Sequence, residues 1–163
     1  VINVLIKEGK MARAIVIYES KYGNTRLMAE KIAEGIRQAS GVEAEVRELK
    51  EVNPEGLPEF DAIVIGSPNH MGNATRSIRK FIDELAKFSF EGKLAAVFDT
   101  CIGRDLEKAV KKMEKQIGEK APSLSLAAPG LSVRVEGMKG PITEGELPRC
   151  QDFGIKIGNR LKA

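Results

Sequence analysis

Residues that carry catalytic chemistry are scarce in this chain of 163 residues, which has a single histidine, His70, and two cysteines, Cys101 and Cys150. The cysteines lack C-x-x-C spacing and fall in unlike segments, so neither a disulfide framework nor a zinc site is expected. Both should be free thiols. No Ser-His-Asp set, paired-carboxylate motif or metal-ligand cluster stands out. The sequence therefore predicts no catalytic side chain and no metal site.

Long apolar runs and blocks of like charge are also missing. No apolar run approaches the ~20 residues of a membrane span, and no stretch of five like charges occurs. The net charge of +3 is small and spread along the chain, which disfavours nucleic-acid binding. We expect a soluble cytoplasmic protein without a membrane span.

The composition is typical of one globular domain. Hydrophobic residues make up 42% of the chain and charged residues 30%, and this length buries one core rather than two. The core pattern begins directly after Met11, and residues 1–10 lack the features of a secretory signal. Residues 11–163 are therefore expected to form the domain, with 1–10 an N-terminal extension ahead of a natural start at Met11. The alternative for this extension is a short edge strand at 2–6.

Short apolar runs in the sequence alternate with longer stretches of helical period. An edge strand is predicted at 43–49, where apolar and charged residues alternate. The runs 123–127 and 131–135 compete for the last strand, or form two pieces of it. Strands buried on both faces are predicted where the runs are continuously apolar, at 14–18, 62–66 and 94–98.

Four stretches with a helical apolar period lie between or after these runs. Helices are predicted at 24–39 and at 144–161, with Pro148 near the first turn of the latter, where a missing N–H costs least. The other two helices carry apolar faces over 78–85 and 106–117. Alternating strands and helices imply right-handed crossovers, and hence an α/β fold with an open parallel sheet and helices on both faces.

Parallel sheets of this kind bind ligands beyond the carboxyl ends of their strands. The loops 19–25, 67–73 and 99–104 are therefore the candidates for a binding site. In the first, Ser20 and Thr25 bracket a helix start whose free N–H groups and positive dipole end suit a phosphate. A plain helix cap is the alternative. No Walker A or G-x-G-x-x-G motif occurs, which disfavours nucleoside triphosphates and dinucleotides.

The stretch "YESKYGNT" resembles the phosphate loop of the flavodoxin family, especially the variants in flavodiiron proteins and flavin-dependent quinone reductases. The likeness extends to "AIVIGSPNHMGNATRSIRKFIDEL", "GKLAAVF" and "PITEGELPRCQDFGIKIG", and so to nearly all of residues 12–162. This resemblance implies a flavodoxin-like three-layer α/β/α fold, with a five-stranded parallel sheet in the order 2-1-3-4-5.

The resemblance also implies bound flavin mononucleotide (FMN). The phosphate is expected on the first loop and the isoalloxazine ring between the second and third loops. The residues expected to bind it are Ser20, Lys21, Tyr22, Gly23, Asn24, Thr25, Pro68, Asn69, His70, Met71, Gly72, Asn73, Asp99, Thr100, Cys101, Ile102 and Gly103.

The second loop, "SPNHMGN", offers two side chains, His70 and Met71, that are able to lie against a flat ring. The alternatives are an exposed loop position for His70 and core packing for Met71. In flavodoxins, a peptide of this loop makes a redox-dependent hydrogen bond to flavin N5. The peptide Met71–Gly72 or Gly72–Asn73 is the candidate here.

The third loop, "FDTCIGRD", departs from the family pattern, because many flavodoxins place an aromatic side chain there to cover the ring. Stacking would have to come from Cys101, Ile102, Tyr22 or His70, and the ring would be more exposed. Backbone N–H groups of 99–103 are expected to bond the pyrimidine edge. Cys101 beside a flavin suggests a redox role; a small buried side chain is the favoured alternative.

The leading functional hypothesis is an FMN-binding electron carrier that shuttles electrons between redox partner proteins, rather than an enzyme. One alternative is an NAD(P)H-dependent quinone or flavin reductase, and another is a flavin-free binding module. A monomer or small homo-oligomer is expected. Typical flavodoxins are acidic, whereas this chain has basic residues close to the predicted site, so a different partner surface is expected; these residues are Arg76, Arg79, Lys80 and Arg104.

Overall fold

The strands lie where the apolar runs predicted them. The computed structural model describes residues 11–162, so the predicted extension at 1–10 and its alternative edge strand lie outside the described part. The strands are Ala12–Tyr18 (β1), Val42–Glu48 (β2), Ala62–Pro68 (β3), Leu94–Cys101 (β4), Ser125–Leu126 (β5) and Leu131–Arg134 (β6).

The sheet is parallel throughout, and its order β2-β1-β3-β4-β5 confirms the predicted order 2-1-3-4-5. The last strand is split, because β5 pairs with the start of β4 and β6 pairs with its end. The two competing runs are therefore two pieces of one strand. Pro129 separates them, and proline has no N–H to donate to the ladder.

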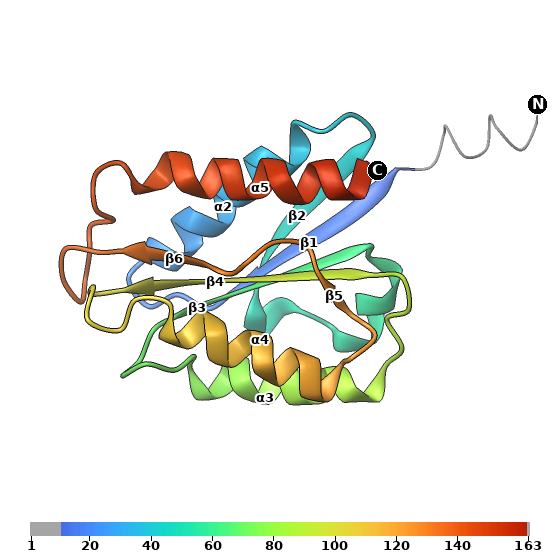
Figure 1. Ribbon diagram of the computed structural model, residues 1–163, viewed down its shortest axis with the longest axis horizontal. Coiled ribbons are helices and arrows are strands. Elements are labelled where there is room, and N and C mark those ends of the chain that lie inside the picture. Colours follow the sequence, from blue (N-terminus) through green and yellow to red (C-terminus); the bar gives the residue numbers. More distant parts are fainter. Residues whose placement is uncertain (1–10, 163) are drawn as a thin grey trace, which may run out of the picture.

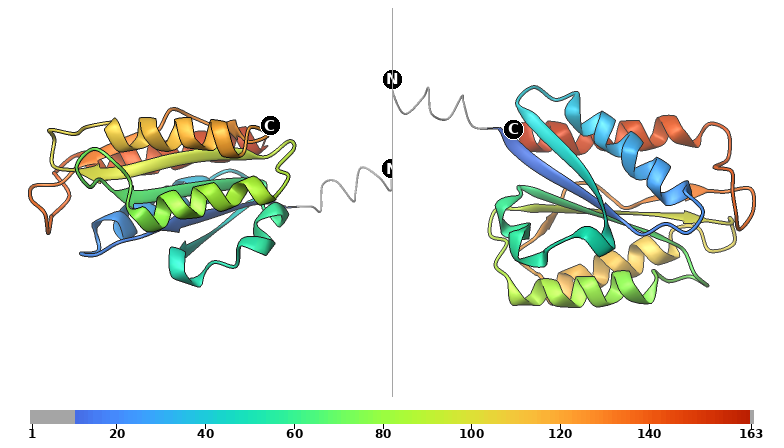
Figure 2. Two further views of the ribbon diagram at one scale, coloured as in Figure 1. Left: turned by 90° about the horizontal axis from the view of Figure 1, so that it is seen from below. Right: turned by 180° about the vertical axis from the view of Figure 1, so that it is seen from behind.

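Helices cover both faces of the sheet (Figure 1, Figure 2). Asn24–Arg37 (α2) and Glu146–Lys162 (α5) lie on one face, and Arg76–Glu84 (α3) and Lys108–Lys120 (α4) lie on the other. All four helices were predicted, with small differences at their ends. Pro148 is the third residue of α5, in the first turn as expected.

Short 3-10 helices complete the fold. The crossover from β2 to β3 contains Leu49–Glu51 (η1) and Pro54–Glu59 (η2) in place of an α-helix, and Leu85–Lys87 (η3) follows α3. Two prolines in η2, Pro54 and Pro58, remove N–H donors that a longer α-helix would use. Leu57 of η2 is buried against the core on the α3 and α4 side.

The helices α2 and α5 touch through glycines. A Cβ atom on Gly35 would collide with the carbonyl oxygen of Gln151, and one on Gly154 would collide with that of Ile32. Because neither glycine has a side chain, the two helices pack backbone to backbone, and Ile32 and Phe153 fill the space beneath them. This contact fixes the position of α2, whose first turn borders the predicted site.

The strands all run in the same direction, so their carboxyl ends meet at one edge of the sheet, on the left in Figure 1. The loops that follow β1, β3 and β4 lie together at this edge.

Candidate functional site

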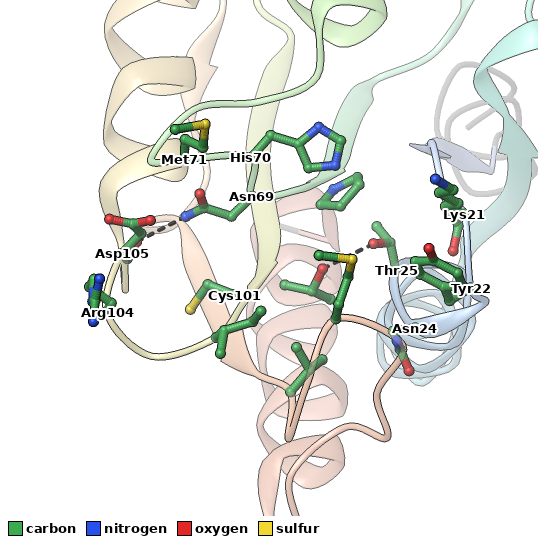
Figure 3. Close-up of a pocket in the computed structure, with 16 residues that line it drawn as sticks. Lys21, Tyr22, Asn24, Thr25, Asn69, His70, Met71, Cys101, Arg104 and Asp105 are labelled. Atoms are coloured by element: carbon green, nitrogen blue, oxygen red, sulfur yellow. Dashed lines mark hydrogen bonds between the residues drawn. The ribbon is translucent and has the colours of Figure 1, made fainter.

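The three predicted loops surround one cavity of about 530 Å³, which is within the ~300–1,000 Å³ usual for small-molecule sites (Figure 3). Most of the predicted site residues line it: Ser20, Lys21, Tyr22, Asn24, Thr25, Pro68, Asn69, His70, Met71, Thr100, Cys101 and Ile102. The predicted residues that are not part of its lining are Gly23, Gly72, Asn73, Asp99 and Gly103. The lining also includes Arg104, Asp105, Val135 and Met138, which were not among the predicted site residues.

The first loop leaves the start of α2 open. Gly23 is the N-cap, with φ +91°, and makes no side-chain capping bond, and the first turn contains no acidic residue. The hydroxyl of Ser20 accepts the Gly23 N–H at 3.0 Å, and the first helical bond runs from the Leu27 N–H to the Gly23 carbonyl. Neither Asn24 nor Thr25, the residues on which the plain-cap alternative was based, is therefore the N-cap residue. The N–H groups of the first three helical residues precede this first bond and are available to an anion.

Thr25 connects the first loop to β4. Its Oγ1 lies 3.3 Å from Oγ1 of Thr100, and both side chains are buried. The dashed line that begins at Thr25 in Figure 3 marks this contact. It brings two hydroxyls from distant parts of the chain to the floor of the cavity, beside the open helix end.

The second loop is a tight hairpin turn. Met71 (φ +54°) and Gly72 (φ +85°) are its central residues, and His70 and Asn73 exchange N–H···O bonds of 2.7 and 3.1 Å across it. Two successive positive φ values are typical of a type I′ turn. The Oδ1 of Asn69 accepts the Gly72 N–H at 2.7 Å, so the turn is held from inside.

This turn decides the alternative for Met71. Met71 is 96% exposed, so the core-packing alternative for it is wrong; the turn carries its side chain away from the core. His70 is exposed at the same edge of the cavity. The Nδ2 of Asn69 donates to the carbonyl of Asp105 at 2.9 Å, which joins the second loop to the third.

The third loop begins later than predicted. Residues 99–101 were expected to be loop, but β4 continues to Cys101, and Asp99 pairs with Ser67 of β3 and Ser132 of β6. The expected open turn at Asp99 is therefore wrong. The reason is that β6 extends the ladder past the apolar run. The turn proper starts at Ile102, whose carbonyl accepts the Arg104 N–H at 2.8 Å.

The side chain of Asp99 points away from the cavity and caps α4. Its Oδ2 accepts the Val110 N–H at 3.2 Å and its Oδ1 accepts the hydroxyl of Ser132. That hydroxyl oxygen in turn accepts the N–H of Glu107, the N-cap residue of α4. Burial raises the pKa of Asp99 to about 6, although both hydrogen bonds act to lower it.

Both cysteines are free and buried. Cys101 is 3% exposed, with its Sγ 3.6 Å from the Ser132 hydroxyl, which matches the favoured expectation of a small buried side chain. Burial raises the pKa of Cys150 to about 12, so this thiol is not ionised near neutral pH. Within residues 11–162, no group of three or more His, Cys, Asp or Glu side chains is arranged to hold a metal ion, and no helix is long and apolar enough to cross a membrane.

A fourth segment that sequence reasoning missed also borders the cavity. Residues 135–142 form a hairpin, with Val135 bridging Ile142 and the Glu136 N–H donating to the Pro141 carbonyl at 2.8 Å. Its tip carries Met138 to the cavity. The available signal was "GMKGP", two glycines and a proline typical of a turn, but nothing local shows where such a turn points.

Basic side chains border the cavity, but of the four basic residues expected close to the site only Arg104 lines it. Arg76, Arg79 and Lys80 are not part of the lining. Lys21 lies with its Nζ 5.4 Å from the centre of the Tyr22 ring, and Arg104 is exposed at the rim. The one acidic lining residue, Asp105, forms an ion pair with Lys108 at 3.0 Å. The lining therefore has a positive balance.

Comparisons with known proteins place these features in context. A family model described as a flavodoxin domain matches residues 15–135. The chain is 35% identical over 85 residues to a flavodoxin of Clostridium saccharobutylicum, covering 52% of this chain and 53% of that protein. It is 32% identical over 104 residues to an NAD(P)H dehydrogenase (quinone) of Acidithiobacillus ferrooxidans, covering 52% of each. The chain thus spans about half the length of these curated relatives.

Among solved structures, the fold is similar to that of a flavodoxin from the domain Archaea, with a TM-score of 0.79 and 28% sequence identity. The match covers 93% of this chain and 99% of that one. Flavodiiron cores are also among the structural neighbours, at identities that support the fold alone.

Proposed function

This chain belongs to the flavodoxin domain family, whose members bind FMN, and we propose that it binds FMN in the cavity and carries electrons between redox partner proteins. The observation that supports this best is the open start of α2. Helix N–H groups without a side-chain cap, flanked by the hydroxyls of Ser20 and Thr25, suit a doubly negative phosphate ester.

The rest of the cavity fits the remainder of the cofactor. Tyr22, Met71 and Ile102 present exposed apolar surface to it, as a flat conjugated ring requires. Bound FMN would supply one- and two-electron redox chemistry. The contribution of the chain is to hold the phosphate and to orient the ring, so no side chain has to act as acid or base.

The geometry of the second loop favours one of the two candidate peptides for the bond to flavin N5. Rotating the Met71–Gly72 peptide would turn a type I′ turn into type II′, which requires glycine at the position of Met71. Rotating Gly72–Asn73 changes the backbone of Gly72, which tolerates it. We therefore assign the flexible peptide to Gly72–Asn73.

The proposed partners are proteins with an acidic docking surface, because Lys21 and Arg104 leave the rim of the cavity positive. The monomer or small homo-oligomer expected from the sequence is kept as part of this proposal. A cytoplasmic location is also proposed, since both cysteines are free thiols.

Titration of the apoprotein with FMN, followed by quenching of flavin fluorescence, tests the binding proposal. Replacing Ser20 or Thr25 with alanine should cost about 1 kcal/mol or somewhat more each, because each hydroxyl bonds a charged group. Ser89→Ala, an exposed serine outside the lining, is the matched control. Unchanged affinity in the double variant contradicts the phosphate site. Failure of the wild-type protein to bind FMN favours the flavin-free binding module.

The similarity to an NAD(P)H dehydrogenase (quinone) makes a reductase the second candidate. Steady-state assays of the FMN-loaded protein separate it from the carrier. Rapid NADPH oxidation with a quinone and no partner protein favours the reductase. Negligible NADPH oxidation, together with fast reduction of a protein acceptor by the chemically reduced protein, favours the carrier.

A further inference from the structure

The hairpin 135–142 has a well-fixed base. The Thr143 N–H donates to the Arg134 carbonyl at 2.9 Å and closes the hairpin at its open end. The Glu136 N–H···O bond to Pro141 holds the middle, and the Gly140 N–H donates to the Gly137 carbonyl at 2.9 Å to form the tip. This hydrogen-bonded ladder gives the tip a defined position relative to β6.

The tip is also seated on the first loop. A Cβ atom on Gly140 would lie 2.5 Å from Oδ1 of Asn24, so the glycine packs closely against the Asn24 side chain, and its φ of +93° also favours glycine at this position. Asn24 is the first residue of α2 and lines the cavity. The hairpin therefore reaches from the end of β6 to the proposed phosphate site and forms a wall of the same cavity.

Met138 is placed on this wall with most of its side chain open to solvent, at 73% exposure. Large apolar side chains are seldom clustered in water without a ligand or partner. Within residues 11–162, the exposed large hydrophobic residues that line this cavity are Tyr22, Met71, Ile102 and Met138; the others lie elsewhere on the surface.

We propose that Met138 is a ring-positioning residue: its thioether covers the flavin ring from the hairpin, in place of the aromatic side chain missing after β4. This inference rests on the proposed binding of FMN. A thioether is flexible and polarisable, and makes favourable contacts with aromatic rings. With Met71 on the second loop, it gives the cavity two methionines carried by separate hairpins, both of which are braced by hydrogen bonds.

The test compares affinities for FMN, for riboflavin, which has the ring without the phosphate, and for inorganic phosphate as a competitor of FMN. Met138→Ala should weaken FMN and riboflavin binding by the same factor, about tenfold, and leave phosphate binding unchanged. Met138→Leu, which keeps the apolar cover, should restore most of the affinity. Met11→Ala is the matched control, since Met11 is an exposed methionine outside the cavity.

Two results overturn the inference: Met138→Ala binding both flavins as tightly as Met11→Ala does, or losing affinity for phosphate to the same extent as for FMN. Thermal unfolding of the apoproteins should be unchanged, because Met138 is mostly exposed, and a lowered melting temperature would assign it a structural role instead. Failure of the proposed function looks different, because the wild-type protein would then show no saturable binding of FMN.

Discussion

The starts of α2 and α4 lie at the same edge of the sheet, but they differ in whether a side chain of the protein accepts the free N–H groups of the first helical turn. Neither N-cap residue, Gly23 or Glu107, makes a side-chain capping bond, and both have positive φ. At α4 a buried carboxylate, that of Asp99, occupies the helix end. At α2 no side chain does so, and the helix end borders the cavity. The carboxylate of Asp99 occupies the start of α4, so that helix end stabilises the fold. The start of α2 has no such carboxylate, so its N–H groups are free to bind a ligand.

The largest expected effect comes from making α2 resemble α4. Ser20→Asp keeps an acceptor for the Gly23 N–H but adds a negative charge beside the phosphate site. Two unit charges 4 Å apart repel by about 4 kcal/mol at an effective dielectric constant of 20, so FMN affinity should fall about a thousandfold at low salt. Titration by flavin fluorescence measures it.

Two controls sharpen this experiment. Ser20→Asn, which is neutral and of similar size to aspartate, should lose far less affinity. The loss in Ser20→Asp should also shrink as salt is raised, because the first loop is largely exposed to solvent. Equal losses in the two variants would mean that shape, rather than charge, decides binding at this helix end.

The second prediction concerns the carboxylate at α4. The pKa of Asp99 is about 6 in the folded protein, against an ordinary 3.8, so the native state holds a proton that the unfolded state releases. The free energy of unfolding should therefore fall as pH rises from 3.8 to 6. The difference between a pKa of about 6 and one of 3.8 corresponds to a fall of roughly 3 kcal/mol in the free energy of unfolding. Because the carboxyl group is buried, solvent screens this effect little.

Asp99→Asn removes the ionisable group, so comparing it with the wild-type protein isolates the contribution of Asp99 to the pH dependence of the free energy of unfolding. The asparagine can accept the Val110 N–H with its carbonyl and donate to the Ser132 hydroxyl with its amide. Urea unfolding from pH 3.5 to 7 should show the wild-type protein losing roughly 3 kcal/mol relative to the variant. Parallel curves for the two proteins would mean that Asp99 ionises as easily in the fold as in the unfolded chain.

The contrast also explains what was predictable from the sequence. Strands and helices followed from apolar periodicity, because burial on both faces leaves continuous runs such as 62–66. The order of the strands in the sheet followed only from the resemblance to the flavodoxin family. The open start of α2 was predictable because Ser20, Gly23 and Thr25 lie within one short stretch, residues 20–25. The role of Asp99 was not, since its partners Val110 and Ser132 are 11 and 33 residues away.

The same distinction applies to the cavity walls. Polar residues 99–101 predicted a loop, but pairing with β6 made them strand, a tertiary effect without a local signal. Met138 is a turn residue in the sequence, and it lines the cavity on a hairpin that packs on Asn24 through Gly140. Features that depend on residues close together in the sequence could therefore be predicted, whereas contacts between distant segments were seen only in the structure.

The smallest expected effect tests the residue that lies between the two helix starts. In β4, the carboxylate of Asp99 accepts a hydrogen bond from the first turn of α4, and the hydroxyl of the next residue, Thr100, contacts that of Thr25 in α2. Thr100→Val removes one hydroxyl at nearly constant volume. Stability should fall by about 1 kcal/mol, as for the loss of one buried hydrogen bond.

The affinity of this variant for FMN should change less than about threefold, because the Thr25 hydroxyl can still donate to the phosphate without Thr100. Thr100→Ser, which keeps the hydroxyl, should restore the stability. A tenfold loss of affinity in Thr100→Val with recovery in Thr100→Ser would instead make Thr100 a direct ligand. In that case the strand β4 would supply an anchor to both helix ends, and the anion site at α2 would depend on the sheet as well as on its own loop.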